Sequence, residues 1–148
     1  MNHMTPRIEE LAFGTPEYDA SVALRQRWLR DPLGLQFTDE DRADDMAMRH
    51  LGYYLGETMV GCVALLPLDE RQMRLRQLIV DPGYERRGIG RVLVERSETL
   101  AREAGCTQMI LYARDTAVGF YDRLGYQSVG EPFLEIGIVH QKMVKRLQ

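Results

Sequence analysis

An arginine-flanked loop near the middle of the chain is the first candidate for chemistry. It follows an apolar strand-like run that ends at Val80, and it opens the amphipathic helical pattern from Gly88 to Ala104, which Gly105 ends. The first amide N–H groups of a helix lack intrahelical partners, and the helix dipole is positive there. The loop is therefore predicted to bind a phosphate group through Glu85, Arg86, Arg87, Gly88, Ile89, Gly90 and Arg91.

The loop does not match two common nucleotide-binding motifs. Gly88 and Gly90 let the backbone approach an anion, and the flanking arginines add positive charge. Leu93 stands where a dinucleotide fingerprint needs its third glycine, and no Gly-Lys-Ser/Thr follows as in a Walker loop. A helix that simply begins with glycine is the alternative interpretation.

These arginines belong to a basic stretch within an acidic chain. The formal net charge is −3, which excludes a general attraction to nucleic acid. A polyanionic ligand is predicted at mid-chain, and a solvated arginine-rich surface is the alternative. The stretch holds seven arginines and three acidic residues: Arg71, Arg74, Arg76, Arg86, Arg87, Arg91 and Arg96 against Asp81, Glu85 and Glu95.

Length and composition predict one globular domain over residues 1–148. The chain is 45% hydrophobic and 28% charged, an ordinary balance for a folded protein. No apolar run reaches the roughly 18 residues of a membrane span, and Met1–Pro6 lacks the order of a signal peptide. We therefore expect a cytoplasmic protein without a membrane partner. Cys62 and Cys106 lack the spacing of a zinc site, so free thiols and no metal are expected.

The periodicity of the rest of the chain predicts helices packed on a mostly antiparallel sheet, an α/β arrangement. Thr15 and Asp115 are expected to cap helices. Expected strands are 7–13, 49–55, 58–66, 73–80 and 108–113, with two more between 126 and 147; expected helices are 16–29, a short one near 38–41, 88–104 and 116–124.

The strand before the loop changes its side-chain parity. Met73 and Leu75 are apolar at odd positions, whereas Leu78 and Val80 are apolar at even positions. Because successive side chains of a strand point to opposite faces, a β-bulge would produce this change. Irregular burial at the end of the strand is the alternative.

Two motifs in this order resemble the GCN5-related N-acetyltransferases, the GNAT family. The first is Val80-Asp81-Pro82 followed by Gly88-Ile89-Gly90, with Glu85 where the family usually has Gln or Arg. The second is Ala113-Arg-Asp-Thr-Ala117-Val-Gly-Phe120-Tyr121-Asp-Arg-Leu-Gly125-Tyr126, with Arg114 where Asn or Gln is usual. The tail from Gly130 to Met143 is similar to the ElaA/YjcF-like branch.

The resemblance implies a GNAT fold, with a mixed, mostly antiparallel sheet of about six or seven strands, about four helices and a bulge before the loop. It implies acetyl-coenzyme A as cosubstrate and no metal. The loop would hold the pyrophosphate. Leu78 would polarise the thioester carbonyl through its backbone N–H, Ile79 and Val80 would bind the pantetheine arm, and Arg114 and Tyr121 would also contact the cosubstrate.

The resemblance further implies an acyltransferase that passes acetyl to a primary amine by direct attack in a ternary complex. Tyr121 would be the general acid that protonates the departing thiolate. His140 and Glu135 are the candidates for the base, ahead of His50, Asp69 and Glu70. Trp28, Tyr53 and Tyr54 could line an acceptor pocket, although core packing also explains them.

Three questions stay open at the level of the sequence. A sensor that binds acyl-coenzyme A without turnover is one alternative, and a small phosphate- or nucleotide-binding regulatory protein is another. The acceptor is a small-molecule or peptide amine, and the sequence does not indicate which one. The acidic stretch 39–45 suggests a cationic acceptor or a solvated face. A homodimer is compatible with the family.

Overall fold

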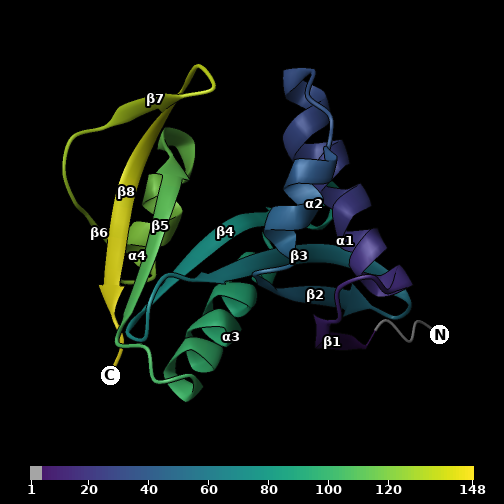
Figure 1. Cartoon of the computed structure of the whole chain (residues 1–148), viewed down its shortest axis with the longest axis horizontal. Coiled ribbons are helices and arrows are strands. Elements are labelled where there is room, and N and C mark those ends of the chain that lie inside the picture. Colours follow the sequence, from purple (N-terminus) through teal and green to yellow (C-terminus); the bar gives the residue numbers. More distant parts are fainter. Residues whose placement is uncertain (1–4) are drawn as a thin grey trace.

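An eight-stranded sheet forms the frame of the computed structural model, which describes residues 5–148 (Figure 1). The strands lie in the order β1-β2-β3-β4-β5-β8-β6, with β7 paired to β8. Within the described range, all pairings are antiparallel except that of β4 with β5. This confirms the predicted sheet type, with slightly more strands than expected. Met1–Met4, which carried most of the signal-peptide argument, lie outside the described residues.

The helices and strands follow the expected order along the chain. The strands are β1 (Pro6–Leu11), β2 (Arg49–Leu55), β3 (Thr58–Pro67), β4 (Gln72–Val80), β5 (Gln108–Arg114), β6 (Gln127–Ser128), β7 (Phe133–Glu135) and β8 (Ile138–Arg146). The α-helices are α1 (Pro16–Arg25), α2 (Asp39–Asp45), α3 (Ile89–Glu103) and α4 (Val118–Arg123). No helix among residues 5–148 is long and apolar enough to cross a membrane.

Three local predictions need correction. The first helix ends at Arg25 rather than Leu29, because Gln26–Arg30 continues as a π-helical turn. Asp115 does not cap the last helix: the N–H of Val118 bonds to the Asp115 carbonyl instead, which closes a 3₁₀ turn before α4. The tail forms three strands rather than two, because β7 and β8 make a hairpin and β6 also pairs with β8.

The main core lies between the sheet and α3 (Figure 1). Leu93 and Val94 of α3 are fully buried and share a cluster with Val63 and Leu65 of β3. Because side chains alternate along a strand, Cys62 of β3 faces the opposite side, where α1 contacts β3 and β4. The sheet is thus covered on both faces at its centre.

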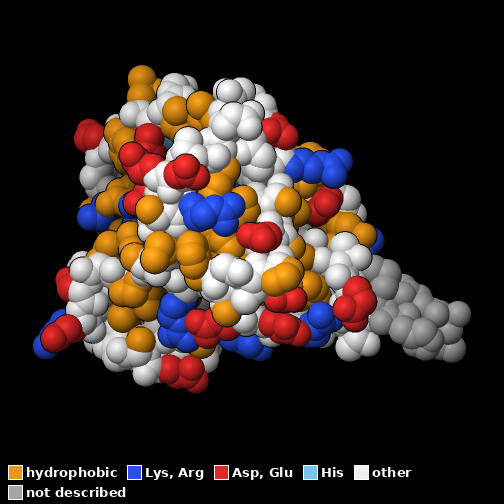
Figure 2. Space-filling view, turned by 45° about the vertical axis from the view of Figure 1, so that its right-hand side comes forward, with side chains coloured by type: hydrophobic (Ala, Val, Ile, Leu, Met, Phe, Trp, Pro, Cys, Tyr) orange, Lys and Arg blue, Asp and Glu red, His pale blue; other side chains and the backbone are white. Residues whose placement is uncertain are grey.

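The two cysteines are buried free thiols, as predicted. Burial raises the pKa of the Cys62 thiol to about 12. On the surface shown in Figure 2, acidic and basic side chains are interspersed with apolar ones. That face therefore carries no extended field of one sign.

Candidate active site

β4 carries the predicted bulge. Gln77 and Leu78 stand opposite Val63 of β3, two residues against one. Gln77 has a φ of 55°, in the left-handed region that few residues other than glycine adopt. Leu75 before the bulge and Leu78, its second residue, consequently pack against the same core. The change of parity in the sequence reports this bulge.

β4 and β5 separate soon after they pair. Their parallel register covers only Gln72–Arg74 against Gln108–Ile110. From residue 75 to 80 the edge of β4 has no pairing with β5, so its backbone groups on that side can bind a ligand. Leu78, Ile79 and Val80, the residues expected to bind the cosubstrate through their backbone, lie on this part of the strand.

A cavity of about 330 Å³ lies where the two strands separate. It is lined from β4, β5, the turn before α4, the β7–β8 hairpin and the segment after α1. All three candidates for proton transfer contribute to its wall, together with two further candidates for cosubstrate binding: Tyr121, His140 and Glu135, with Leu78 and Arg114.

Tyr121 enters the cavity from α4. Its side chain is 7% exposed and lies between the rings of Phe120 and Tyr126, edge to face, with centroids 5.0 and 5.7 Å away. Burial raises the pKa of the Tyr121 phenol above its ordinary value. The hydroxyl is protonated at neutral pH, as an ordinary phenol is, and burial makes it a weaker acid than an exposed tyrosine.

His140 lies on β8 with one ring nitrogen already engaged. Nδ1 is 2.8 Å from the carbonyl oxygen of Ile138. Because a carbonyl only accepts, Nδ1 carries the hydrogen, and in the neutral ring Nε2 is the nitrogen able to take a proton. The ring also stacks on Phe133 at 5.8 Å. Glu135 is exposed at the end of β7, so it lies nearer to solvent than His140.

The loop before α3 forms a separate part of the site. Gly88 is the N-cap residue with a φ of 78°, and no side chain caps the helix. The first amides of α3 are therefore open to an anion, and Arg86 and Arg87 are exposed beside them. The side chain of Ile89 is buried in the core, so only its backbone remains for a ligand.

Gly90 has a packing role that the sequence did not reveal. A Cβ atom at this position would lie 3.2 Å from Cζ of Phe120, on α4. The glycine thus permits close contact between α3 and α4, and its replacement would disturb that contact as well as any ligand. Arg91 is partly occupied by an ion pair with Glu95, at 3.0 Å.

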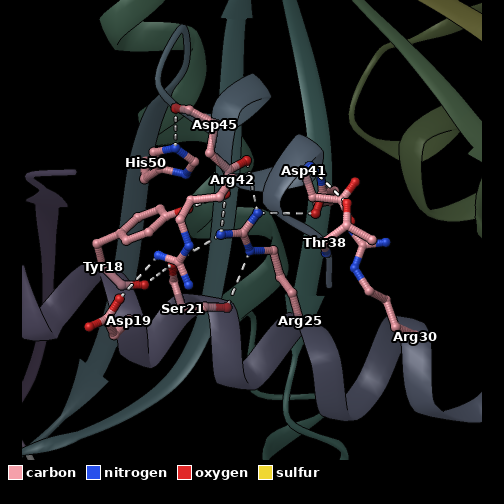
Figure 3. A network of polar contacts seen from close by, with 11 residues as sticks. Tyr18, Asp19, Ser21, Arg25, Arg30, Thr38, Asp41, Arg42, Asp45 and His50 are labelled. Carbon is pink, nitrogen blue, oxygen red and sulfur yellow. Dashed lines mark hydrogen bonds and ion pairs between the residues drawn. The ribbon is translucent and has the colours of Figure 1, made fainter. Parts of the chain in front are cut away.

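A buried polar network around Arg25 (Figure 3) makes a hydrogen bond to Gln77 at the bulge. Arg25 of α1 is 1% exposed and pairs with Asp45 of α2, with Nη2 and Oδ2 2.9 Å apart. The same guanidinium donates to Oε1 of Gln77 at 3.2 Å, and the hydroxyl of Tyr18 donates to Asp45 at 2.6 Å. Burial opposes the charge of Asp45, but the hydrogen bonds from Arg25 and Tyr18 prevail and lower its pKa.

The sequence did not predict this network, because an arginine near the end of a helix is usually exposed to solvent. The weaker candidate His50 also belongs to it: Nε2 lies 2.9 Å from the backbone oxygen of Asp45, away from the cavity. Asp69 accepts two backbone N–H groups in the β3–β4 turn. Tyr53 and Tyr54 are buried on β2, and neither lines the cavity.

Comparison with known proteins assigns this arrangement to a family. The family model described as the acetyltransferase (GNAT) domain matches residues 36–147. A Bacillus subtilis (strain 168) protein named as a candidate acetyltransferase is 33% identical over 137 residues, which are 89% of this chain and 92% of that protein.

Solved structures share the fold. Escherichia coli ElaA superposes with a TM-score of 0.81 at 20% identity, over 94% of this chain and 99% of that one. A GNAT family acetyltransferase from Elizabethkingia anophelis, determined with acetyl-CoA bound, superposes with a TM-score of 0.73 at 19% identity, over 96% and 98% of the two chains.

Proposed function

We propose that this chain, which belongs to the GNAT acetyltransferase family, transfers acetyl from acetyl-coenzyme A to a primary amine by direct attack in a ternary complex. The family model and the relatives make the chain an N-acetyltransferase enzyme. The direct mechanism is supported by one observation above all: Leu78, Tyr121 and His140 line the same cavity at the split between β4 and β5. We also propose that residues 1–148 act as one domain.

The described residues fit acetyl-coenzyme A along this split. The open amides at the start of α3 would hold the pyrophosphate, with charge from Arg86 and Arg87. The unpaired edge of β4 at Ile79 and Val80 would bond the pantetheine arm. A backbone N–H at Leu78 would then polarise the thioester carbonyl, a contact worth up to about 3–4 kcal/mol in other enzymes.

The transfer requires two proton movements that the cavity can provide. The amine nitrogen attacks the thioester carbon, its C–N bond forms and the C–S bond breaks. Nε2 of His140, or the carboxylate of Glu135, takes the proton that the amine loses. The hydroxyl of Tyr121 gives a proton to the sulfur and is later reprotonated from solvent.

Acetyl-coenzyme A is expected to stabilise the protein. At a hundred times its dissociation constant, a ligand of the native state adds about 2.7 kcal/mol to the free energy of unfolding. Thermal unfolding with acetyl-coenzyme A, ATP and NAD as ligands measures this, and only the first should raise Tm. An equal rise with ATP or NAD would favour a nucleotide-binding protein instead.

Free thiol release with a panel of amines then separates an enzyme from a sensor. Release above the rate of spontaneous hydrolysis supports acetyl transfer to an amine. Tight binding of acetyl-coenzyme A without release from any amine in the panel would favour the acyl-coenzyme A sensor.

Gly88→Ala is expected to weaken acetyl-coenzyme A binding about tenfold, because its methyl group would project where the pyrophosphate approaches. Gly105→Ala is the matched control at the other end of α3. Both glycines have positive φ, 78° and 89°, and at both positions an added Cβ meets no atom within 4 Å. Each variant should therefore lose a similar stability, about 1–2 kcal/mol.

Calorimetry measures the affinity of the two variants for acetyl-coenzyme A. Weakened binding in Gly88→Ala alone supports the predicted pyrophosphate site. Equal affinities in the two variants would place the pyrophosphate away from the start of α3.

A further inference from the structure

The cavity has an excess of positive charge that its own residues do not balance. Its wall holds four arginines, Arg30, Arg74, Arg76 and Arg114, and two carboxylates, Asp41 and Glu135. Arg30 pairs with Asp41 at 3.6 Å, so those two charges compensate each other. The ion pairs found among residues 5–148 include none with Arg74, Arg76 or Arg114.

Arg74 is the most constrained of the unpaired arginines. Its guanidinium lies 4.5 Å over the ring of Tyr112, and its Nε atom is buried without a hydrogen-bond partner in the described part of the chain. Burial, and then the charge of Arg76, lower the Arg74 pKa, against smaller opposite effects of Tyr112 and Glu135. A partly buried charge without a counter-ion is costly, and an anion bound in the cavity would lower that cost.

The two β4 arginines lie on the side of the sheet away from the main core. Met73 and Leu75 point into the core beneath α3, so Arg74 and Arg76 between and after them point to the other face. They are on the cavity wall together with His140 and Tyr121. The start of α3, where the pyrophosphate is proposed to bind, is not part of this wall.

Two of the five carboxylates of α2 are already engaged within the fold and are not free to bind a cationic acceptor. Asp41 accepts the backbone N–H of Thr38 in a capping box and pairs with Arg30. Asp45 is buried against Arg25. The acidic stretch read from the sequence thus has two of its carboxylates engaged within the fold.

We infer that the acceptor is a small amine that also carries a carboxylate or phosphate group, which Arg74 and Arg76 bind. The inference rests on the proposed function and names the substrate class of the same site. A guanidinium presents paired N–H donors that match two oxygens of such an anion. Anchored there, the acceptor would place its amine within the cavity that His140 and Tyr121 line.

Matched pairs of amines test the inference. L-tyrosine with tyramine and L-phenylalanine with phenethylamine differ by one carboxylate, and phosphoethanolamine with ethanolamine by one phosphate. At saturating acetyl-coenzyme A, we expect kcat/KM for thiol release to be at least tenfold higher for the anionic member of at least one pair. The pair that shows it distinguishes carboxylate from phosphate.

Variants at Arg74 of β4 and at Arg71 in the preceding turn show whether Arg74 is responsible for the preference for anionic amines. Arg74→Gln should remove the preference by raising KM for the anionic amine, with acetyl-coenzyme A affinity unchanged. Arg74→Lys keeps the charge without the paired donors and should be intermediate. Arg71→Gln, at an exposed arginine outside the cavity, is the matched control and should retain the preference.

Three outcomes would overturn the inference. Equal or better turnover of the amines that lack the anionic group is one, and an unchanged preference in Arg74→Gln is another. If no amine of any pair releases thiol although acetyl-coenzyme A binds normally, a small anionic acceptor is rejected, but the proposed cosubstrate site still stands. Failure of acetyl-coenzyme A to bind the unmodified protein would instead refute the proposed function itself.

Discussion

Tyr121→Phe is expected to lower kcat by about 10²-fold or more while the protein stays folded. The substitution keeps the ring between Phe120 and Tyr126 and removes only the hydroxyl. General acid catalysis typically contributes about 10²–10⁴-fold, and a phenol, with an ordinary pKa near 10, carries its proton at neutral pH. Thiol release at saturating concentrations of both substrates measures kcat directly.

Tyr53→Phe is a suitable control for that variant. It removes the hydroxyl of another buried tyrosine, on β2, that does not line the cavity. Its kcat should match that of the unmodified protein, and calorimetry should give both variants the unmodified affinity for acetyl-coenzyme A. An unchanged kcat in folded Tyr121→Phe would return Tyr121 to a packing role and agree with the sensor interpretation.

The second large effect is expected from Arg25→Met, which should lower the free energy of unfolding by about 3–5 kcal/mol. Removing one partner of a buried ion pair leaves the other charge without compensation. Asp45 would keep the hydrogen bond from the hydroxyl of Tyr18 but lose those from Arg25. Gln77 at the bulge would lose the hydrogen bond that Arg25 donates to it. Urea unfolding of the purified variant measures the loss.

Two further variants separate charge burial from loss of bulk. Arg49→Met breaks an exposed pair with Glu10 and should cost about 0.2–1 kcal/mol. Arg25→Met combined with Asp45→Asn should lose less than the sum of the two single changes, because the second change removes the uncompensated charge. Strict additivity of the two changes would contradict an energetic coupling through the Arg25–Asp45 ion pair drawn in Figure 3.

Patterns confined to one element were predictable from the sequence. The apolar spacing of α3 and the glycine after it predicted the helix within a residue of its bounds. The change of parity between Leu75 and Leu78 indicated either a bulge or irregular burial at the strand end, and the register shows the bulge. Thr15 caps α1 as expected, through the N–H of Tyr18. Each of these depends on neighbours along the chain.

Contacts between elements could not be predicted from the sequence. The seven mid-chain arginines read as one basic stretch, yet Arg74 and Arg76 face the cavity while Arg86 and Arg87 are exposed beside α3. Nothing in the local pattern shows this separation, because it arises from the register of β4 and from the loop that follows it. The role of Arg25 was hidden for the same reason.

The sequence by itself therefore determined the kinds of residues, the elements that carry them and, through two motifs, the resemblance to the GNAT family. Only the tertiary structure decided which side chains meet. Tyr121 of α4, Glu135 of β7 and His140 of β8 reach one cavity because β5 pairs with β8 along its whole length but leaves β4 after three residues. Side-chain periodicity is a local property of the backbone, whereas a cavity depends on how distant strands pair and separate.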